Sequence, residues 1–360
     1  MIHISKRGEL SRGRIIGIRL VAIAVGILLC SVITTVTTGV NPLEVGSAVF
    51  AGSFGTARKT WLFFQKTAVL LLISLAVTPA FKMRCWNLGA EGQVLAGAMA
   101  AAACMVLMAD AASNTAVIIC MTVAAVLAGA LWAAIPAFFK AKFNTNETLF
   151  TLMMNYVATQ IVAFFCVKWE NPKGSCQIGV INQKSNVGWF PQLVNRYLLV
   201  IVVVAAVTVL MYFYLRYSKH GFELTVVGES ERTARYVGIK VERVIIRTML
   251  LSGAVCGLAG LLLVGSINHT VSTTLAGGQG FTAVMVAWLA QFDPIAMVLA
   301  SGLLILLGTG ANELATACGL NAAFGDILTA VLIFCIIGSE FFINYQLRFA
   351  KKHKEVKENV

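Results

Sequence analysis

Charged residues are scarce in this chain, and their scarcity excludes most soluble folds. Only 12% of the 360 residues are Asp, Glu, Lys or Arg, whereas 58% are apolar and the mean hydropathy is +0.83. A soluble domain usually carries about 25% charged residues, because its surface must be hydrated. The sequence therefore predicts a protein that lies in a lipid bilayer.

The usual signatures of enzymes and metal sites are missing as well. The four histidines are scattered, with no HExxH or GxSxG motif near them. The nine cysteines form no CxxC motif and no Cys/His ligand spacing. No GxxxxGK[ST] phosphate loop is present, so any ATP hydrolysis has to come from another protein. We expect no catalytic activity, no metal site and no cofactor in this chain.

Long apolar runs fill most of the sequence. A membrane-spanning helix needs about 20 apolar residues, so we expect an all-α polytopic protein of about ten helices, several of them short or interrupted. The expected segments are residues 15–39, 61–79, 88–109, 115–139, 147–167, 197–217, 249–267, 280–292, 295–311 and 323–342. They predict one membrane domain over residues 15–348, between a cytoplasmic N-terminal segment, 1–14, and a basic cytoplasmic tail, 349–360.

The distribution of Lys and Arg over alternating loops predicts the orientation. With the N-terminus inside, 21 of these 28 residues lie on the cytoplasmic side and 7 lie outside. Both termini are then cytoplasmic, which requires an even number of spans. We interpret the net charge of +12 as a signal of topology and of attraction to anionic lipid, not of nucleic-acid binding. The cytoplasmic set includes Lys6, Arg7, Arg12, Arg14, Lys82, Arg84, Lys140, Lys142, Lys351, Lys352, Lys354 and Lys357.

A compact charged stretch, residues 223–247, stands between two long apolar runs. Charges are excluded from hydrocarbon, so this stretch must lie in water or against a partner. We interpret it as a docking surface for a soluble protein; a solvated amphipathic linker is the alternative. The other long polar segment, residues 168–196, has a Trp near each end and is expected to be an external loop.

Polar residues inside apolar segments mark the candidate pathway, because each is costly in a bilayer. Asn87, Glu91 and Gln93 lie among glycines at the start of the third expected span. Glycines let the backbone break and free its N–H and C=O groups to meet a polar solute. The alternative is that Glu91 only caps its own helix, near the positive end of the helix dipole.

A second polar group, Glu147, Thr151 and Asn155, recurs every four residues and so lines one face of a helix. This stripe predicts a lined channel, but hydrogen bonds between packed helices explain it equally well.

The third candidate is the glycine cluster with Gly278, Gly280 and Phe281, which opens a short span that stops at Asp293 and Pro294. The pattern predicts a broken or re-entrant helix lining a cavity. Close helix packing is the competing explanation, and it is the better one for the Gly253/Gly257 pair of the seventh span.

Four ordered motifs carry a resemblance to a known family. NLGAEGQ, NETLFTLMMNY, GESERTARYVGI and GGQGFTAVMVAWL…P occur in this order between residues 15 and 348. The chain resembles the nucleoside-type permeases of bacterial ABC importers, within the wider superfamily of branched-chain amino acid and ribose permeases. The resemblance implies a permease fold of ten helices, similar to that of the vitamin B12 importer.

The resemblance also implies a division of labour in a bacterial plasma membrane. An external substrate-binding protein or lipoprotein delivers the solute, two permease subunits form the pathway, and two cytoplasmic ATPase subunits drive it. The second permease is expected to be a related but different chain. The implied solute is a nucleoside or a related sugar, and Trp86, Tyr156 and Phe281 are candidates to stack a base.

The motif GESERTARYVGI resembles the family's coupling segment, whose short helix contacts the ATPase. Carried over by position, the contact residues are Glu229, Arg232, Ala234, Arg235, Tyr236 and Gly238. An alternative from another class stays open: a secondary transporter that uses Glu91 or Glu147 as a proton-linked carboxylate, without any ATPase.

Overall fold

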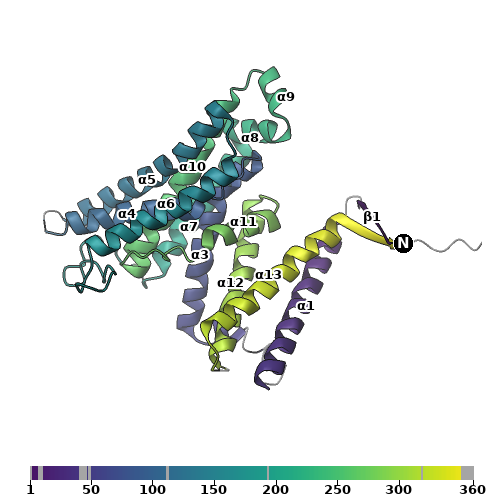
Figure 1. Cartoon of the computed structure of the whole chain (residues 1–360), viewed down its shortest axis with the longest axis horizontal. Coiled ribbons are helices and arrows are strands. Elements are labelled where there is room, and N and C mark those ends of the chain that lie inside the picture. The colour runs from purple at the N-terminus through teal and green to yellow at the C-terminus, as the bar shows by residue number, and fades with distance from the viewer. Residues whose placement is uncertain are drawn as a thin grey trace, which may run out of the picture. The chain divides into compact units, whose positions relative to one another are not determined.

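The computed structural model describes residues 2–6, 11–39, 47, 50–110, 113–192, 194–317 and 319–349. Arg7 and the tail lysines Lys351, Lys352, Lys354 and Lys357, which contribute to the predicted orientation, lie outside the described residues. The described part is almost entirely helical, as predicted (Figure 1).

Nine helices among the described residues are long and apolar enough to cross a membrane. Nine of the ten expected segments coincide with them, and the tenth, 280–292, is the short helix α11. An 11-residue helix rises only about 17 Å, which is too short to span a bilayer. The helices are α1 (Arg12–Thr38), α3 (Ala57–Lys82), α4 (Ala90–Leu107), α5 (Asn114–Phe143), α6 (Glu147–Lys168), α7 (Leu198–Tyr217), α8 (Lys219–Glu229), α9 (Glu231–Tyr236), α10 (Val241–Leu262) with its π-helical extension η1 (Leu263–Asn268), α11 (Gln279–Leu289), α12 (Pro294–Ala317) and α13 (Ala322–Asn344).

The chain forms two compact units, Met1–Thr60 with Leu304–Val360, and Trp61–Leu303. In the first unit α1 lies along α13, the helices at opposite ends of the sequence (Figure 1). Gly26 allows close contact with Leu332, and the Cys30 thiol points at the Leu328 carbonyl, 3.5 Å away. Arg19 and Glu340 form an ion pair at 3.4 Å. Each of these two apolar helices thus contributes one charged side chain to an ion pair within the unit.

A two-stranded antiparallel sheet among the described residues was not predicted from the sequence. Strand β1 (Ile2–Lys6) pairs with β2 (Tyr345–Phe349), in a register that sets Ile2 opposite Phe349 and Ile4 opposite Leu347. Both segments alternate apolar and polar residues, but five residues are too few for a distinct strand signal. The pairing places the described residues next to both chain ends side by side.

In the second unit α4, α5 and α10 pack closely through glycines. Gly253 and Gly257 on α10 approach the backbone of α5, at Gly129 and Ala125, so closely that an added Cβ would overlap a carbonyl oxygen. Gly97 on α4 meets Gly257 in the same way. The close packing predicted for the Gly253/Gly257 pair is therefore confirmed, and it fixes the backbone around which the polar residues are arranged.

The loops of this unit gather at its two ends. At one end an apolar cluster joins Met83 and Cys85 after α3, Ala137 of α5, and Leu224 and Ala234 of the charged stretch. At the other end the loop between α6 and α7 is fixed to the helix ends. Asn182 donates to the Met105 carbonyl at 2.8 Å, and Phe190 donates to the Gly265 carbonyl at 3.0 Å. The basic pairs Lys82/Arg84 and Lys140/Lys142 thus flank the same end as the charged stretch.

The segment between η1 and α12 runs from one of these ends to the other. At its start Val271 offers its carbonyl to Cys166, near the end of α6. At its finish the Trp288 ring lies 5.3 Å from the ring of Trp86, which follows Cys85. The segment is therefore a broken crossing, made of turns followed by the half-length helix α11, which is one of the two forms, broken or re-entrant, that the sequence predicted.

Candidate functional site

The turn between α3 and α4 is held by a fully buried amide pair. The Asn87 Nδ2 donates to Ser252 Oγ at 2.9 Å, and its Oδ1 accepts from the Gly89 N–H at 3.0 Å and from Gln93 Nε2 at 3.1 Å. Asn87 and Gln93 are 0% and 1% exposed. These two candidate pathway residues therefore contact protein groups in this conformation, and they tie the break in the backbone to α10.

The polar stripe of α6 meets the same break. Thr151 Oγ1 accepts from the Leu88 N–H at 3.2 Å, and Asn155 clamps the backbone with two bonds, from Gly92 N–H at 2.9 Å and to the Leu88 carbonyl at 2.8 Å. The structure thus brings together two segments that the sequence indicated separately, and α6 supplies the partners that unwound backbone needs at membrane depth.

Glu147 occupies a different place from the other polar residues of its helix. It stands in the first turn of α6, and its carboxylate pairs with Lys140 of α5 at 2.9 Å. Asn146 caps the helix by accepting from the Leu149 N–H at 3.2 Å. Glu147 therefore stabilises the α5–α6 junction, beside the apolar cluster that includes Ala234.

Glu91 reaches the third candidate cluster. Its Oε1 accepts from the Gly278 N–H and its Oε2 from the Gly280 N–H, both at 2.8 Å. The carboxylate thus caps the N-terminus of α11, whereas the N-cap of its own helix, Gly89, has no side-chain hydrogen bond. Phe281 follows with its side chain 41% exposed. The structure accordingly joins Glu91, Gly278 and Gly280 into one arrangement.

The arrangement is a discontinuous crossing whose backbone groups are bound by side chains. Positive backbone angles at Gly277 and Gly278, φ of 57° and 74°, form the turn before α11. Trp86 and Trp288, 41% and 48% exposed, lie against each other with tilted rings near the C-terminus of α11. In transporters, broken helices place helix ends and polar groups where a solute can meet them within the bilayer.

The charged stretch forms most of α8, the whole of α9 and the first two turns of α10, and α8 and α9 present an exposed face. Ser230 separates α8 from α9 and caps α9 by accepting from the Thr233 N–H at 3.2 Å. Arg232, Arg235 and Tyr236 are exposed, Tyr236 to 92%. Gly238, with φ of 85°, ends the turn, and Glu229 is exposed at the end of α8.

Ala234 is placed differently from the other five predicted coupling residues. Its side chain is 0% exposed and packs into the chain's own apolar cluster with Met83, Leu224 and Val241. It cannot offer its methyl group to a partner in this structure. We assign it instead the role of fixing α9 to the membrane helices, which leaves the neighbouring arginines outward.

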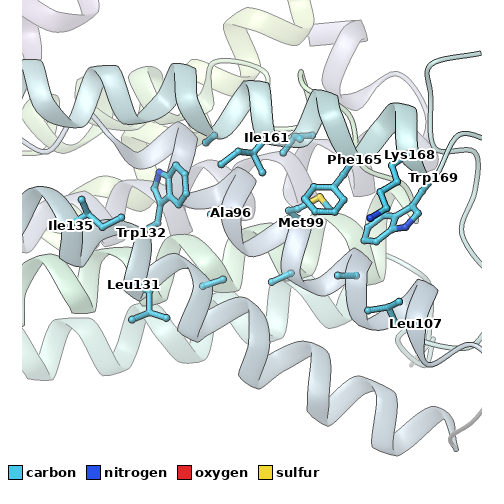
Figure 2. Close-up of a pocket in the computed structure, with 15 residues that line it drawn as sticks. Ala96, Met99, Leu107, Leu131, Trp132, Ile135, Ile161, Phe165, Lys168 and Trp169 are labelled. Atoms are coloured by element: carbon cyan, nitrogen blue, oxygen red, sulfur yellow. The ribbon is translucent and has the colours of Figure 1, made fainter.

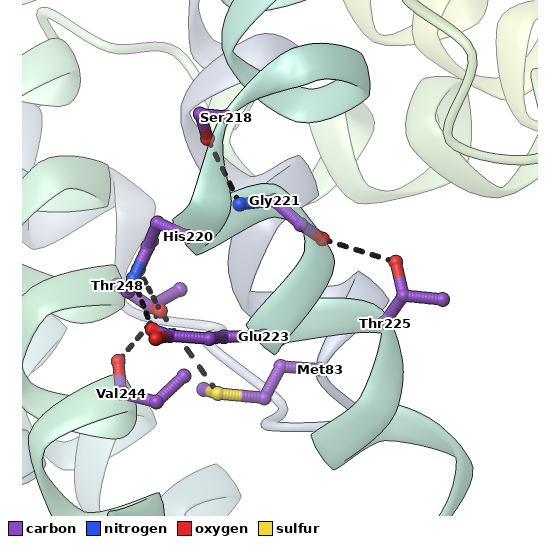
Figure 3. A network of polar contacts seen from close by, with 8 residues as sticks. All are labelled: Met83, Ser218, His220, Gly221, Glu223, Thr225, Val244 and Thr248. Carbon is purple, nitrogen blue, oxygen red and sulfur yellow. Dashed lines mark hydrogen bonds and ion pairs between the residues drawn. The ribbon is translucent and has the colours of Figure 1, made fainter. Parts of the chain in front are cut away.

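Behind this face a polar network connects α8 to α10 (Figure 3). His220 lies 3.4 Å from the Glu223 carboxylate and 3.2 Å from Thr248 Oγ1, which in turn donates to the Val244 carbonyl at 2.7 Å. Burial lowers the pKa of His220 from its ordinary value of 6.5, and this loss of hydration outweighs the opposing effect of Glu223, while Arg247 acts in the same direction as burial.

Acid should therefore weaken the fold through His220. The folded protein holds this imidazole neutral, whereas the unfolded chain binds a proton near pH 6.5. The free energy of unfolding should fall as the pH drops through 6.5. His220→Gln should lose less thermal stability than the wild type between pH 7.5 and 5. His269, whose pKa is also lowered, chiefly by burial and then by Arg196, is present in both proteins and cancels in the comparison. Equal losses would contradict the assignment.

A separate apolar groove of about 720 Å³ runs between α4, α5 and α6 (Figure 2). Met99, Trp132, Ile161 and Phe165 line it, and Lys168 and Trp169 stand at one end. Its lining is mostly apolar and so differs from that of the polar arrangement around Glu91.

Several residues of the site were missed from the sequence. Ser252 and Thr248 are four residues apart on α10, so a polar i, i+4 pair in an apolar helix was the available signal. No sequence signal marked Trp288, because one aromatic residue in an apolar segment is ordinary.

Tyr156, a predicted candidate to stack a base, lies 69% exposed on α6, on a shallow surface that Val157, Gln160 and Phe164 also line.

Comparison with known proteins adds a family and several relatives. The family described as branched-chain amino acid transport system, permease component, matches residues 60–337. Guanosine ABC transporter permease protein NupP of Bacillus subtilis is 30% identical, covering 92% of this chain and 94% of its own.

Two further relatives extend over similar lengths. Nucleoside ABC transporter permease protein NupB of Lactococcus lactis subsp. cremoris is 28% identical over 93% of this chain and 94% of its own. Glucose ABC transporter permease protein TsgB13 of Haloferax volcanii is 29% identical over 88% and 86%. The matched residues include α4, α6, α9 and α11, the elements that build the site.

Proposed function

This chain belongs to the family of permease components of branched-chain amino acid transport systems, and we propose that it forms the pathway for a nucleoside in an ABC importer. A related sugar is the other solute within the proposal. The observation that carries it is the exposed helix α9. Buried Ala234 fixes this helix at the end of the protein where the basic pairs Lys82/Arg84 and Lys140/Lys142 lie. A permease without an ATPase site needs such a surface to receive mechanical work.

We propose that both chain ends, and the α9 end of the protein, face the cytoplasm. Basic loops favour the inside of the membrane. Antiparallel pairing of β1 with β2 supports a common side for the termini. Termini on one side require an even number of crossings. The broken crossing that ends in α11 supports this, because it adds one crossing to the nine long helices of the described residues. We also propose that residues 15–348 form a single membrane domain.

We propose partners on both sides of the membrane. Cytoplasmic ATPase subunits bind the face formed by Glu229, Arg232, Arg235, Tyr236 and Gly238. Arginine and tyrosine are, with tryptophan, enriched among the residues that carry most of the binding energy of protein interfaces. A second, related permease completes the pathway, and a substrate-binding protein or lipoprotein delivers the solute from outside.

The chemistry around the broken crossing supports an uncharged, polar solute. Amide and hydroxyl groups at Asn87, Gln93, Thr151 and Asn155 gather within one region, and Phe281 offers an exposed ring. Hydroxyl groups of a ribose and the edges of a base match such donors and acceptors, which in this conformation bind one another and the backbone. The names of the relatives, which specify guanosine, nucleosides and glucose, point to the same classes of solute.

Uptake by cells tests the proposal. Cells that express this chain with its ATPase, second permease and binding protein should accumulate radiolabelled guanosine, adenosine or uridine, and a Lys mutation in the ATPase phosphate loop should abolish the accumulation. Ribose and glucose serve as comparison solutes. Uptake that survives the ATPase mutation would overturn the proposal and favour a secondary transporter that works through Glu91 or Glu147.

A further inference from the structure

The N-terminus of α11 is an anion site with its anion already present. The first N–H groups of a helix have no partner inside the helix, and the helix dipole gives this end about half a positive charge. Here the N–H groups of Gly278 and Gly280 both donate to Glu91, one to each carboxylate oxygen, at 2.8 Å. The carboxylate therefore fills the position that a bound anion would take.

The backbone around Gly280 leaves room for little else. A Cβ added at Gly280 would lie 2.5 Å from the Glu91 nitrogen and 2.9 Å from its Oε2. Gly278 adopts φ of 74°, a left-handed conformation that strains residues with a side chain. These two glycines allow α11 to approach α4 and give both N–H groups to a single side chain.

Glu91 is also the only charged residue in the two helices that meet here. Neither α4 nor α11 carries another Asp, Glu, Lys or Arg, and residues 249–292 carry none at all. Since no lysine or arginine of these elements balances Glu91, the dipole of α11 and its N–H groups are the partners that compensate its charge.

We propose that Glu91 determines the charge specificity of the pathway, as the resident anion of half-helix α11. This inference rests on the proposed transport function. Broken helices in transporters often direct their N-termini at an anionic group of the solute. The N-terminus of α11 carries about half a positive charge and Glu91 a full negative charge, so a solute carrying phosphate or carboxylate meets a net negative site and is repelled. Uncharged nucleosides and sugars are transported, whereas nucleotides and sugar phosphates are excluded.

Truncation of the carboxylate should expose the anion site. Glu91→Ala frees the two N–H groups, and uptake of the nucleoside that the wild type takes up should fall at least about tenfold, since two hydrogen bonds to a charged group are lost. Acetate should restore part of this uptake and raise the thermal midpoint of the purified variant, whereas acetamide, which has the same shape without the charge, should do neither. Neither compound should affect the wild type.

Inorganic phosphate tests the exclusion directly. It should stabilise purified Glu91→Ala against heat and leave the wild type unchanged. Glu170→Ala, which removes a carboxylate from the loop between α6 and α7, is the matched control and should respond to neither anion. If the Ala variant does not fold, Glu91→Gln, which keeps one acceptor, replaces it.

Two outcomes would overturn the inference: a folded Glu91→Ala protein that ignores acetate, or a wild type that phosphate stabilises equally. The thermal measurements need only this chain, so they stand if the wild type proves not to transport nucleosides. Failure of the proposed function and failure of this inference are thereby distinguishable.

Discussion

Gly257→Ala should leave little correctly folded protein. An added Cβ on α10 would overlap the Ala125 carbonyl of α5, and the obstructing atoms belong to backbone that no side-chain rotation can move. Alanine in a helix is favoured over glycine by about 1 kcal/mol, but forcing atoms into a closely packed site costs about 1–3 kcal/mol and sometimes more. The second effect should prevail, with a lower thermal midpoint and a smaller monodisperse fraction of the detergent-purified protein.

Gly302→Ala on α12 is the matched control for this prediction. A Cβ there would lie 3.8 Å from Thr67 Cγ2 and 3.9 Å from Phe63 Cζ, which is ordinary van der Waals contact. The gain in helix propensity is then unopposed, and the midpoint should stay the same or rise. If both substitutions are tolerated alike, the approach of α10 to α5 is not as close as described.

Arg235→Glu should reduce uptake at least about tenfold, the equivalent of about 1.4 kcal/mol of lost docking energy. Arg235 is exposed on α9, beside Tyr236, on the face proposed to receive the ATPase. Reversal of a charge at an interface costs more than its removal, because attraction becomes repulsion. The substitution touches no buried group, so the amount of protein in the membrane should not change. Uptake and co-purification of the ATPase measure the effect.

Arg243→Glu supplies the control for the change in charge. Arg243 is exposed at the start of α10, near α9 in the sequence but outside the proposed contact. It should retain most of the uptake and of the bound ATPase. An equal loss in both variants would mean that the net charge of this end matters, and undiminished uptake with Arg235→Glu would remove the assignment of α9.

The extent of the helices could be predicted from the sequence except where they leave the hydrocarbon. The start of the seventh span was expected at residue 249, yet α10 begins at Val241. Its first two turns carry Glu242, Arg243 and Arg247, which removes them from any apolar window. Their inner face packs through Val244 and Ile245, so the helix continues into the polar region with one face covered.

The polar residues of the site could be identified from the sequence, but their partners could not. A spacing of four correctly placed Thr151 and Asn155 on one face of α6. Nothing in the spacing indicated that they would bind backbone at Leu88 and Gly92, some 60 residues away. Glu91 shows the same limit, because its partners at Gly278 and Gly280 depend on a tertiary approach. Whether these residues line the path of a solute remains a prediction.

The pairing of α1 with α13 has a consequence for the order of biosynthesis. The ribosome completes α1 about 300 residues before α13, and at roughly 5–20 residues per second this interval lasts on the order of 15–60 s. During that time Arg19 lacks Glu340, and a lone cationic side chain in a membrane helix is costly. Helix α1 must therefore be sheltered by the insertion machinery, or held with Arg19 near the lipid headgroups, until α13 arrives.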